Sequence, residues 1–282
     1  MTEPENDKIA KPTAFQGRLP GVSGEFPKVN FMDAEPHRIA VTIMYDGTKY
    51  CGWQVQKNAL SVQQRMQDAL EMLLGFRPDI SGCSRTDAGV HANNYVFHMS
   101  SDGVSVPSER LPQALNAHLH GSSIAVKRAV NVPADFHARY SCIKKEYIYK
   151  IWNAPYLNPF YEGYAWHYPY EIDIDALSFV GEEFCGTHDF RAFMSKGSKI
   201  ADDTVRTVEY FDVSREDELV TVRVCADGFL YNMVRIMVGT YASACAGKLG
   251  KGDISKIILN GKRSGAGDTA PACGLYLNRI VY

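Results

Sequence analysis

The chain has 282 residues, of which 45% are hydrophobic and 22% are charged. This length is ample for two domains, and the apolar fraction is enough for a sizeable core. No stretch approaches the roughly 20 apolar residues of a membrane-spanning helix. The first residues carry acidic side chains and lack the apolar core of a secretory signal. These features favour a soluble, cytoplasmic protein with no membrane contact.

Charge and cysteine content point to neither a metal site nor a strongly basic surface. The formal net charge is −2 at pH 7, so an RNA partner would require the basic residues to be gathered on one part of the surface. The seven cysteines are odd in number, spread along the chain and without a CxxC pair. Free thiols are therefore expected, and no metal.

The first half of the chain reads as alternating strands and helices. Residues 1–37 are rich in proline, which predicts an extended or disordered N-terminal extension. Ser61 with Gln64 forms a capping box, and Gly75 supplies a stop signal, so a helix is expected between them. The other predicted elements are strands at 38–45, 95–99, 124–130 and 146–152 and a helix at 109–119.

The second half mixes the same elements. Helices are predicted at 174–184, at 233–246 with Gly247 as its stop, and from an Asp253 cap to 259. Strands are predicted at 205–213, 219–225 and 275–281. Some strands adjoin directly, which favours an α+β class with mixed or antiparallel sheets over a doubly wound parallel sheet.

Residues 84–92, Ser-Arg-Thr-Asp-Ala-Gly-Val-His-Ala, concentrate chemistry in a short span. Asp87 stands two residues from Arg85, a spacing that suits a carboxylate held ionised as a nucleophile or base. The competing interpretation is a surface turn, because Asp and Gly are ordinary turn residues.

This segment resembles the signature of the tRNA pseudouridine synthase A family, whose usual form begins with Gly where this chain has Ser84. Further blocks that resemble the family follow its order along the chain, at 45–54 with 61–63, 136–149, 232–239 and 274–277. The resemblance covers roughly residues 38–282.

The resemblance implies two pseudo-symmetric α/β halves, with their sheets side by side and a catalytic cleft between them. The boundary is expected near residue 152. Residues 38–152 would be the N-terminal catalytic domain with the nucleophile, and residues 153–282 a C-terminal domain that completes the cleft. The resemblance further implies a homodimer that acts without metal, nucleotide or redox cofactor. Consistent with this, the glycine-rich run 261–267 lacks the Walker order and is predicted to be a loop.

By resemblance, Asp87 is the catalytic nucleophile, and it attacks either C1′ of the ribose or C6 of the uracil. Covalent catalysis divides a difficult transfer into two easier steps. Arg235 is the candidate cation that keeps this carboxylate ionised in a water-poor pocket. Tyr147 matches the active-site tyrosine, whose ring would stack on uracil and whose hydroxyl would assist proton transfer. Tyr149 and Tyr140 are instead expected to pack in the core.

The remaining candidates are substrate-binding residues. Arg85 would hold the flipped nucleotide or a flanking phosphate. His91 and Arg139 would contact RNA or brace the site, two roles that the sequence does not separate. Phe229 is expected to form part of the wall of the pocket. Ser84 excludes any glycine-only backbone angle, so the loop is expected to use ordinary angles there.

The leading functional prediction is a tRNA pseudouridine synthase that acts on uridines 38, 39 and 40 of the anticodon arm. Such a substrate is recognised by shape and phosphate contacts more than by base sequence. One alternative is a paralogue that modifies another RNA. Another, from a different class, is an RNA-binding protein without catalysis.

Overall fold

The computed structural model describes residues 37–195 and 203–282, so the predicted extension falls outside the described residues except for His37. The strands are β1 (Arg38–Tyr45), β2 (Ser81–Gly82), β3 (His91–Ser100), β4 (Ile124–Val132), β5 (Lys144–Trp152), β6 (Trp166–His167), β7 (Gly186–Asp189), β8 (Val205–Glu216), β9 (Leu219–Ala226) and β10 (Leu275–Val281). The α-helices are α1 (Val62–Leu74), α2 (Leu111–His118), α3 (Ser178–Phe184), α4 (Met233–Cys245) and α5 (Asp253–Asn260). Short 3₁₀ turns cover Ser108–Arg110, Phe190–Phe193, Arg263–Gly265 and Ala272–Gly274.

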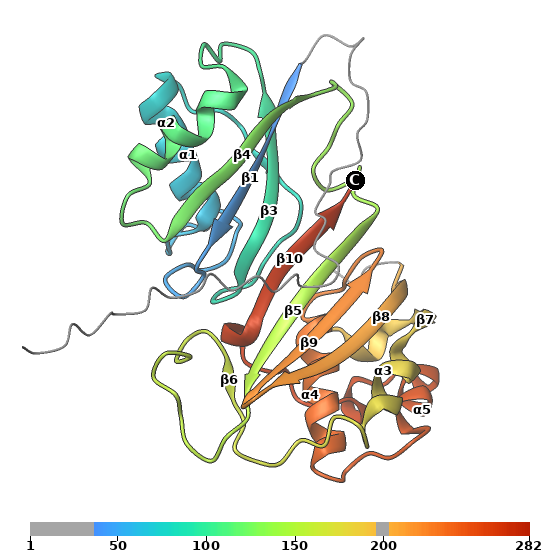
Figure 1. Ribbon diagram of the computed structural model, residues 1–282. Helices are drawn as coiled ribbons and strands as arrows, with labels where there is room; N and C mark the ends of the chain where they lie inside the picture. Colours follow the sequence, from blue (N-terminus) through green and yellow to red (C-terminus); the bar gives the residue numbers. More distant parts are fainter. Residues whose placement is uncertain (1–36, 196–202) are drawn as a thin grey trace, which may run out of the picture.

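One continuous mixed sheet runs through the molecule in the order β4–β1–β3–β10–β5–β9–β8–β7, with β2 beside β3 and β6 beside β5 (Figure 1). The β3–β10 pair is parallel and short, and it aligns Tyr276 with His91 and Leu277 with Ala92. The other pairs along the main order are antiparallel. This arrangement confirms the α+β class with a mixed sheet.

Strands from the two predicted domains are interleaved in this sheet. β5 ends at residue 152, whereas its neighbours β9 and β10 both lie after that residue in the chain. The two predicted sheets are thus joined edge to edge through β3 and β10. The pseudo-symmetry of the halves and the boundary near residue 152 stay predictions.

The helices lie in two groups beside the sheet. α1 and α2 lie beside β4, β1 and β3, whereas α3, α4 and α5 lie near β9, β8 and β7 (Figure 1). α4 is apolar on nearly all sides and correspondingly buried, as expected for a helix enclosed by the rest of the fold. Within the described parts of the chain, no helix has both the length and the apolar character needed to cross a membrane.

Local sequence signals set both ends of α1, whereas two predicted helix starts are exceptions. The hydroxyl of Ser61 accepts a hydrogen bond from the Gln64 N–H at 3.1 Å, and Gly75 ends α1 in the left-handed region at φ 80°. The predicted helix start at residue 174 is wrong. There the Asp173 carboxylate accepts two backbone N–H groups of residues 175 and 176, at 3.1 and 3.0 Å, which favours a turn and delays α3 to Ser178.

The second exception is the start of α5. The N-cap is Gly252, in the left-handed region at φ 86°, and not Asp253 as predicted. Asp253 is the first helical residue, and its carboxylate accepts the N–H of Gly250 at 2.9 Å. Its negative charge still lies in the first turn, where the helix dipole favours it.

Candidate active site

The loop between β2 and β3, which carries Asp87, is held by the block at residues 45–54. The N–H of Trp53 donates to the carbonyl of Thr86 at 3.1 Å, and the N–H of Gly89 donates to the carbonyl of Tyr50 at 3.3 Å. Gly52 has φ 96°, and a Cβ there would lie 2.3 Å from the Thr86 carbonyl oxygen. Only glycine permits this approach. The first block thus supports the loop from behind.

A cleft of about 340 Å³ opens over this loop. It is lined by residues from the signature loop, from β5 and the turn before it, and from the segment that leads into α4. Five of the seven predicted site residues line it, namely Arg85, Asp87, Arg139, Tyr147 and Phe229. The cleft therefore gathers side chains from both sides of residue 152.

Arg235, the sixth predicted residue, reaches Asp87 from the first turn of α4. Its Nη1 lies 3.7 Å from Oδ2 of Asp87, and the two side chains are only 17% and 28% exposed. The guanidinium also donates from Nε to the Ala270 carbonyl at 2.7 Å and from Nη1 to Oδ1 of Asn232 at 2.8 Å. These two bonds fix the cation in place beside the carboxylate.

Two opposing influences act on the Asp87 carboxyl. Burial raises its pKa above the ordinary value, and the positive charge of Arg235 opposes that rise. A partly desolvated carboxylate with one fixed cation is a stronger nucleophile or base than one in bulk water, provided that it remains ionised. The predicted partnership of these two residues matches their geometry.

The glycine-rich run 261–267 contributes to this arrangement from outside the cleft. The N–H of Gly267 donates to the Thr240 hydroxyl at 2.9 Å, and the N–H of Ala270 donates to the carbonyl of Arg235 at 3.1 Å. This segment therefore packs along α4 and delivers the Ala270 carbonyl that holds the guanidinium. No motif in this run indicates such a role, and it was predicted only to be a loop.

Tyr147 lies on β5 with its ring facing the cleft and only 7% of its surface exposed. Phe229 meets the ring edge-on, with 5.1 Å between ring centroids and 86° between ring planes. Burial raises the pKa of Tyr147, so its hydroxyl stays protonated at neutral pH. Tyr149 is fully buried as expected, but the same prediction for Tyr140 is wrong, because it lies in a turn outside the sheet and is 78% exposed.

Four basic side chains of the described residues line the cleft, although the whole chain is slightly acidic. Arg85 and Arg139 were predicted; Arg85 is exposed and makes no hydrogen bond or ion pair with any described residue. Lys145 lies within the block at 136–149 but was not predicted as a site residue, and Arg206 was missed because a single arginine within β8 carries no motif.

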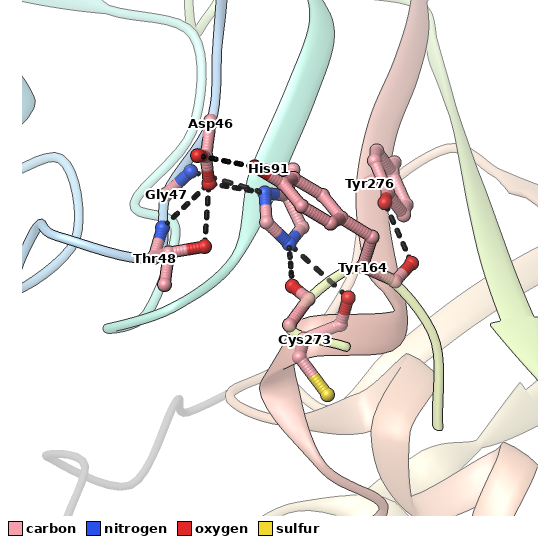
Figure 2. Close-up of polar contacts among 8 residues, drawn as sticks. Asp46, Gly47, Thr48, His91, Tyr164, Cys273 and Tyr276 are labelled. Carbon is pink, nitrogen blue, oxygen red and sulfur yellow. Dashed lines mark hydrogen bonds and ion pairs between the residues drawn. The ribbon is translucent and has the colours of Figure 1, made fainter. Parts of the chain in front are cut away.

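His91, the seventh predicted residue, lies away from the cleft and is only 1% exposed. Its Nδ1 accepts the Gly47 N–H at 3.0 Å and lies 3.2 Å from Oδ1 of Asp46. Because Nδ1 accepts this hydrogen bond, Nε2 carries the ring hydrogen and lies 3.1 Å from the carbonyls of both Gly163 and Cys273 (Figure 2). A direct contact with RNA is incompatible with this burial, whereas bracing agrees with it.

The brace spans the junction of the sheet. His91 begins β3 and stacks on Tyr276 of β10, with 4.6 Å between ring centroids (Figure 2). The Asp46 carboxylate also accepts the Tyr164 hydroxyl at 3.0 Å, which ties in the segment before β6. The signature histidine thus connects β1, β3 and β10 where the two parts of the sheet meet.

This burial makes the stability of the fold depend on pH. The pKa of His91 is lowered, chiefly by burial, and that of His98 is lowered to about 4 for the same principal reason. Between about pH 4 and 6.5 the unfolded chain therefore binds more protons than the folded one, and the free energy of unfolding decreases as the pH falls through this range. For His98 alone the loss is on the order of 3 kcal/mol.

Urea unfolding at several pH values between 7.5 and 4.5 measures this dependence. We expect His91→Asn to be less stable than the wild type at pH 7.5 by about 1–3 kcal/mol, because buried carbonyls lose their donor. We also expect its stability to fall less steeply below pH 6.5. Equal slopes for the two proteins would show that folding does not lower the pKa of His91.

The chain is similar to known proteins over most of its length. Residues 41–141 and 181–282 match the family described as tRNA pseudouridine synthase. The tRNA pseudouridine synthase A of Ruminiclostridium cellulolyticum is 42% identical over 246 residues, which cover 87% of this chain and 99% of that protein. The enzymes of the same name from Acetivibrio thermocellus and Anoxybacillus flavithermus are each 41% identical, over 86% and 87% of this chain and 99% and 98% of their own lengths. The chain belongs to the tRNA pseudouridine synthase family, whose members are isomerases.

Proposed function

We propose that this protein converts uridine to pseudouridine at positions 38, 39 and 40 of the tRNA anticodon arm, with Asp87 as the covalent nucleophile. The observation that carries the proposal is the pairing of a partly buried Asp87 with Arg235 in a cleft that also holds Tyr147. Similarity to curated tRNA pseudouridine synthases over most of the chain supports the substrate class.

The side chains divide the chemistry among them. Asp87 attacks either C1′ of the ribose, which breaks the C1′–N1 bond and leaves the ribose on the carboxylate, or C6 of the uracil, which leaves the base on the carboxylate before the C1′–N1 bond breaks. The base then turns to present C5 to C1′, the C5–C1′ bond forms, the carboxylate leaves and C5 loses its hydrogen as a proton. Arg235 keeps the carboxylate ionised before the attack. The ring of Tyr147 supplies an apolar face for the uracil. Because its hydroxyl is protonated, it assists the loss of the C5 proton as a relay, taking up that proton while it passes its own to water.

The target nucleotide must leave its stack to reach Asp87, at a cost of a few kcal/mol. Four basic side chains at the cleft provide phosphate contacts that repay this cost: Arg85, Arg139, Lys145 and Arg206. None of these contacts requires a particular base. This fits an enzyme that acts on many tRNAs by their shape.

The position of modification is measured by tritium release. Replacement of the C5 hydrogen by the new bond frees tritium from uridine labelled at C5. We expect release from tRNA transcripts with uridine at 38, 39 or 40 alone, and none from a transcript with cytidine at all three. Release only from other positions or other RNAs would favour the paralogue, and binding without any release would favour the non-catalytic alternative.

The homodimer and the cytoplasmic location remain part of this proposal. Light scattering of the full chain measures the mass of the particle in solution. A particle of monomer mass at the concentrations used in the assay would contradict the homodimer.

A further inference from the structure

Ser84 stands where the family usually has glycine, and its surroundings are well defined. It is not among the residues with positive φ, so a side chain is accommodated without strain, as expected. Its carbonyl accepts the Tyr95 hydroxyl at 2.5 Å. Its own hydroxyl lies 3.1 Å from the hydroxyl of Tyr147. Ser84 and Tyr147 both line the cleft.

The hydroxyl of Tyr147 has a single hydrogen-bonding partner among the described residues, which is Ser84. Phe229 and the β5 backbone restrain the tyrosine ring, but neither restrains the rotation of its O–H bond. A buried hydroxyl without a protein partner would rely on water or on the substrate. Ser84 is therefore the described group that restrains this phenol hydroxyl before RNA arrives, whichever of the two oxygens donates.

The serine is itself held rigidly from behind. Tyr95, which bonds its carbonyl, is fully buried and stacks on Trp53 with 4.2 Å between ring centroids. The backbone N–H of Trp53 in turn donates to the carbonyl of Thr86 in the same loop. A rigid support of this kind converts a weak hydroxyl–hydroxyl bond into a directional restraint.

We propose that Ser84 is a positioning residue for Tyr147: its hydroxyl orients the tyrosine hydroxyl within the cleft. The inference rests on the proposed function, since it assigns Tyr147 a part in the reaction. A glycine at this position has no hydroxyl with which to do the same. This chain thus has a contact to its active-site tyrosine that the usual form of the signature lacks.

Single-turnover kinetics with excess enzyme provide the first test. Loss of one neutral hydrogen bond predicts that Ser84→Ala lowers the rate constant by about threefold to tenfold. The Kd for tRNA should be unchanged, and Ser84→Thr should restore the rate because it keeps the hydroxyl. Ser81→Ala is the matched control, since Ser81 is exposed, lies on β2 and does not line the cleft.

A double-mutant cycle and a spectroscopic probe separate positioning from a general effect on the loop. In the Tyr147→Phe background, Ser84→Ala should cause no further loss. With 3-fluorotyrosine placed at 147, the ¹⁹F resonance should move in Ser84→Ala and stay fixed in Ser81→Ala. A wild-type rate in Ser84→Ala, or an unmoved resonance, would overturn the inference. An inactive wild type would instead remove the proposed function, and the resonance would still test the hydrogen bond.

Discussion

Asp87→Asn should abolish pseudouridine formation while tRNA binding persists. The amide has the size of the carboxylate but no anionic oxygen, so the covalent step is lost and the rate should fall by at least about 10⁴-fold. Arg235 keeps its bonds to Ala270 and Asn232, so the cleft should retain its shape. Removal of a negative charge near phosphates should leave the Kd for tRNA equal or slightly lower.

Tritium release and a filter-binding assay on the same preparations measure the two quantities. Asp87→Ala should be included, because deamidation of an introduced asparagine would regenerate the wild-type enzyme. Asp79→Asn is the matched control, since this carboxylate is exposed and is not among the residues that line the cleft. Turnover by Asp87→Ala at the wild-type rate would refute the nucleophile assignment.

Arg235→Met should move the acid limb of the pH–rate profile to higher pH. In the wild type, burial raises the pKa of Asp87 and the Arg235 charge opposes the rise. Without that charge, burial acts unopposed, so the pKa of Asp87 rises further. The carboxylate is then protonated over a wider range of pH. The loss of activity should therefore be greater at pH 6 than at pH 8.5.

Single-turnover rates across this range measure the shift free of product release. Arg235→Lys should give a smaller shift, because it keeps a charge but loses the planar donors that bind Ala270 and Asn232. Arg77→Met, which removes an exposed cation from a surface ion pair, should leave the profile unchanged. A loss that is equal at every pH would mean that Arg235 acts by some means other than the ionisation of Asp87.

Sequence patterns predicted the elements well where the deciding interactions are local. β1 and α1 follow from apolar periodicity and from two end signals, Ser61 and Gly75, that act within one helical turn. The starts of α3 and α5 were misjudged for a related reason. There Asp173 and Gly252 favour other local conformations, and several short-range interactions compete within a few residues.

Motif resemblance identified the chemical groups of the candidate site but not all of their neighbours. It selected Asp87, Tyr147 and Arg235, which the fold brings to one cleft and its edge. It did not foresee Arg206, which no motif marks, and it left two roles open for His91. The burial of the His91 ring distinguishes RNA contact from bracing. That burial depends on which strands enclose the ring, and the motif does not specify those strands.

The sequence by itself determined the family, the α+β class and the residues able to carry the reaction, because residue type and short spacing define these. Only the tertiary structure decided that β3 and β10 join the strands into one sheet, that His91 braces this junction, and that Ser84 meets Tyr147. The physical reason is that pairings between distant strands, and the desolvation they impose, arise from the packing of the whole chain. The sequence of a short segment does not by itself determine which distant segment will pack against it.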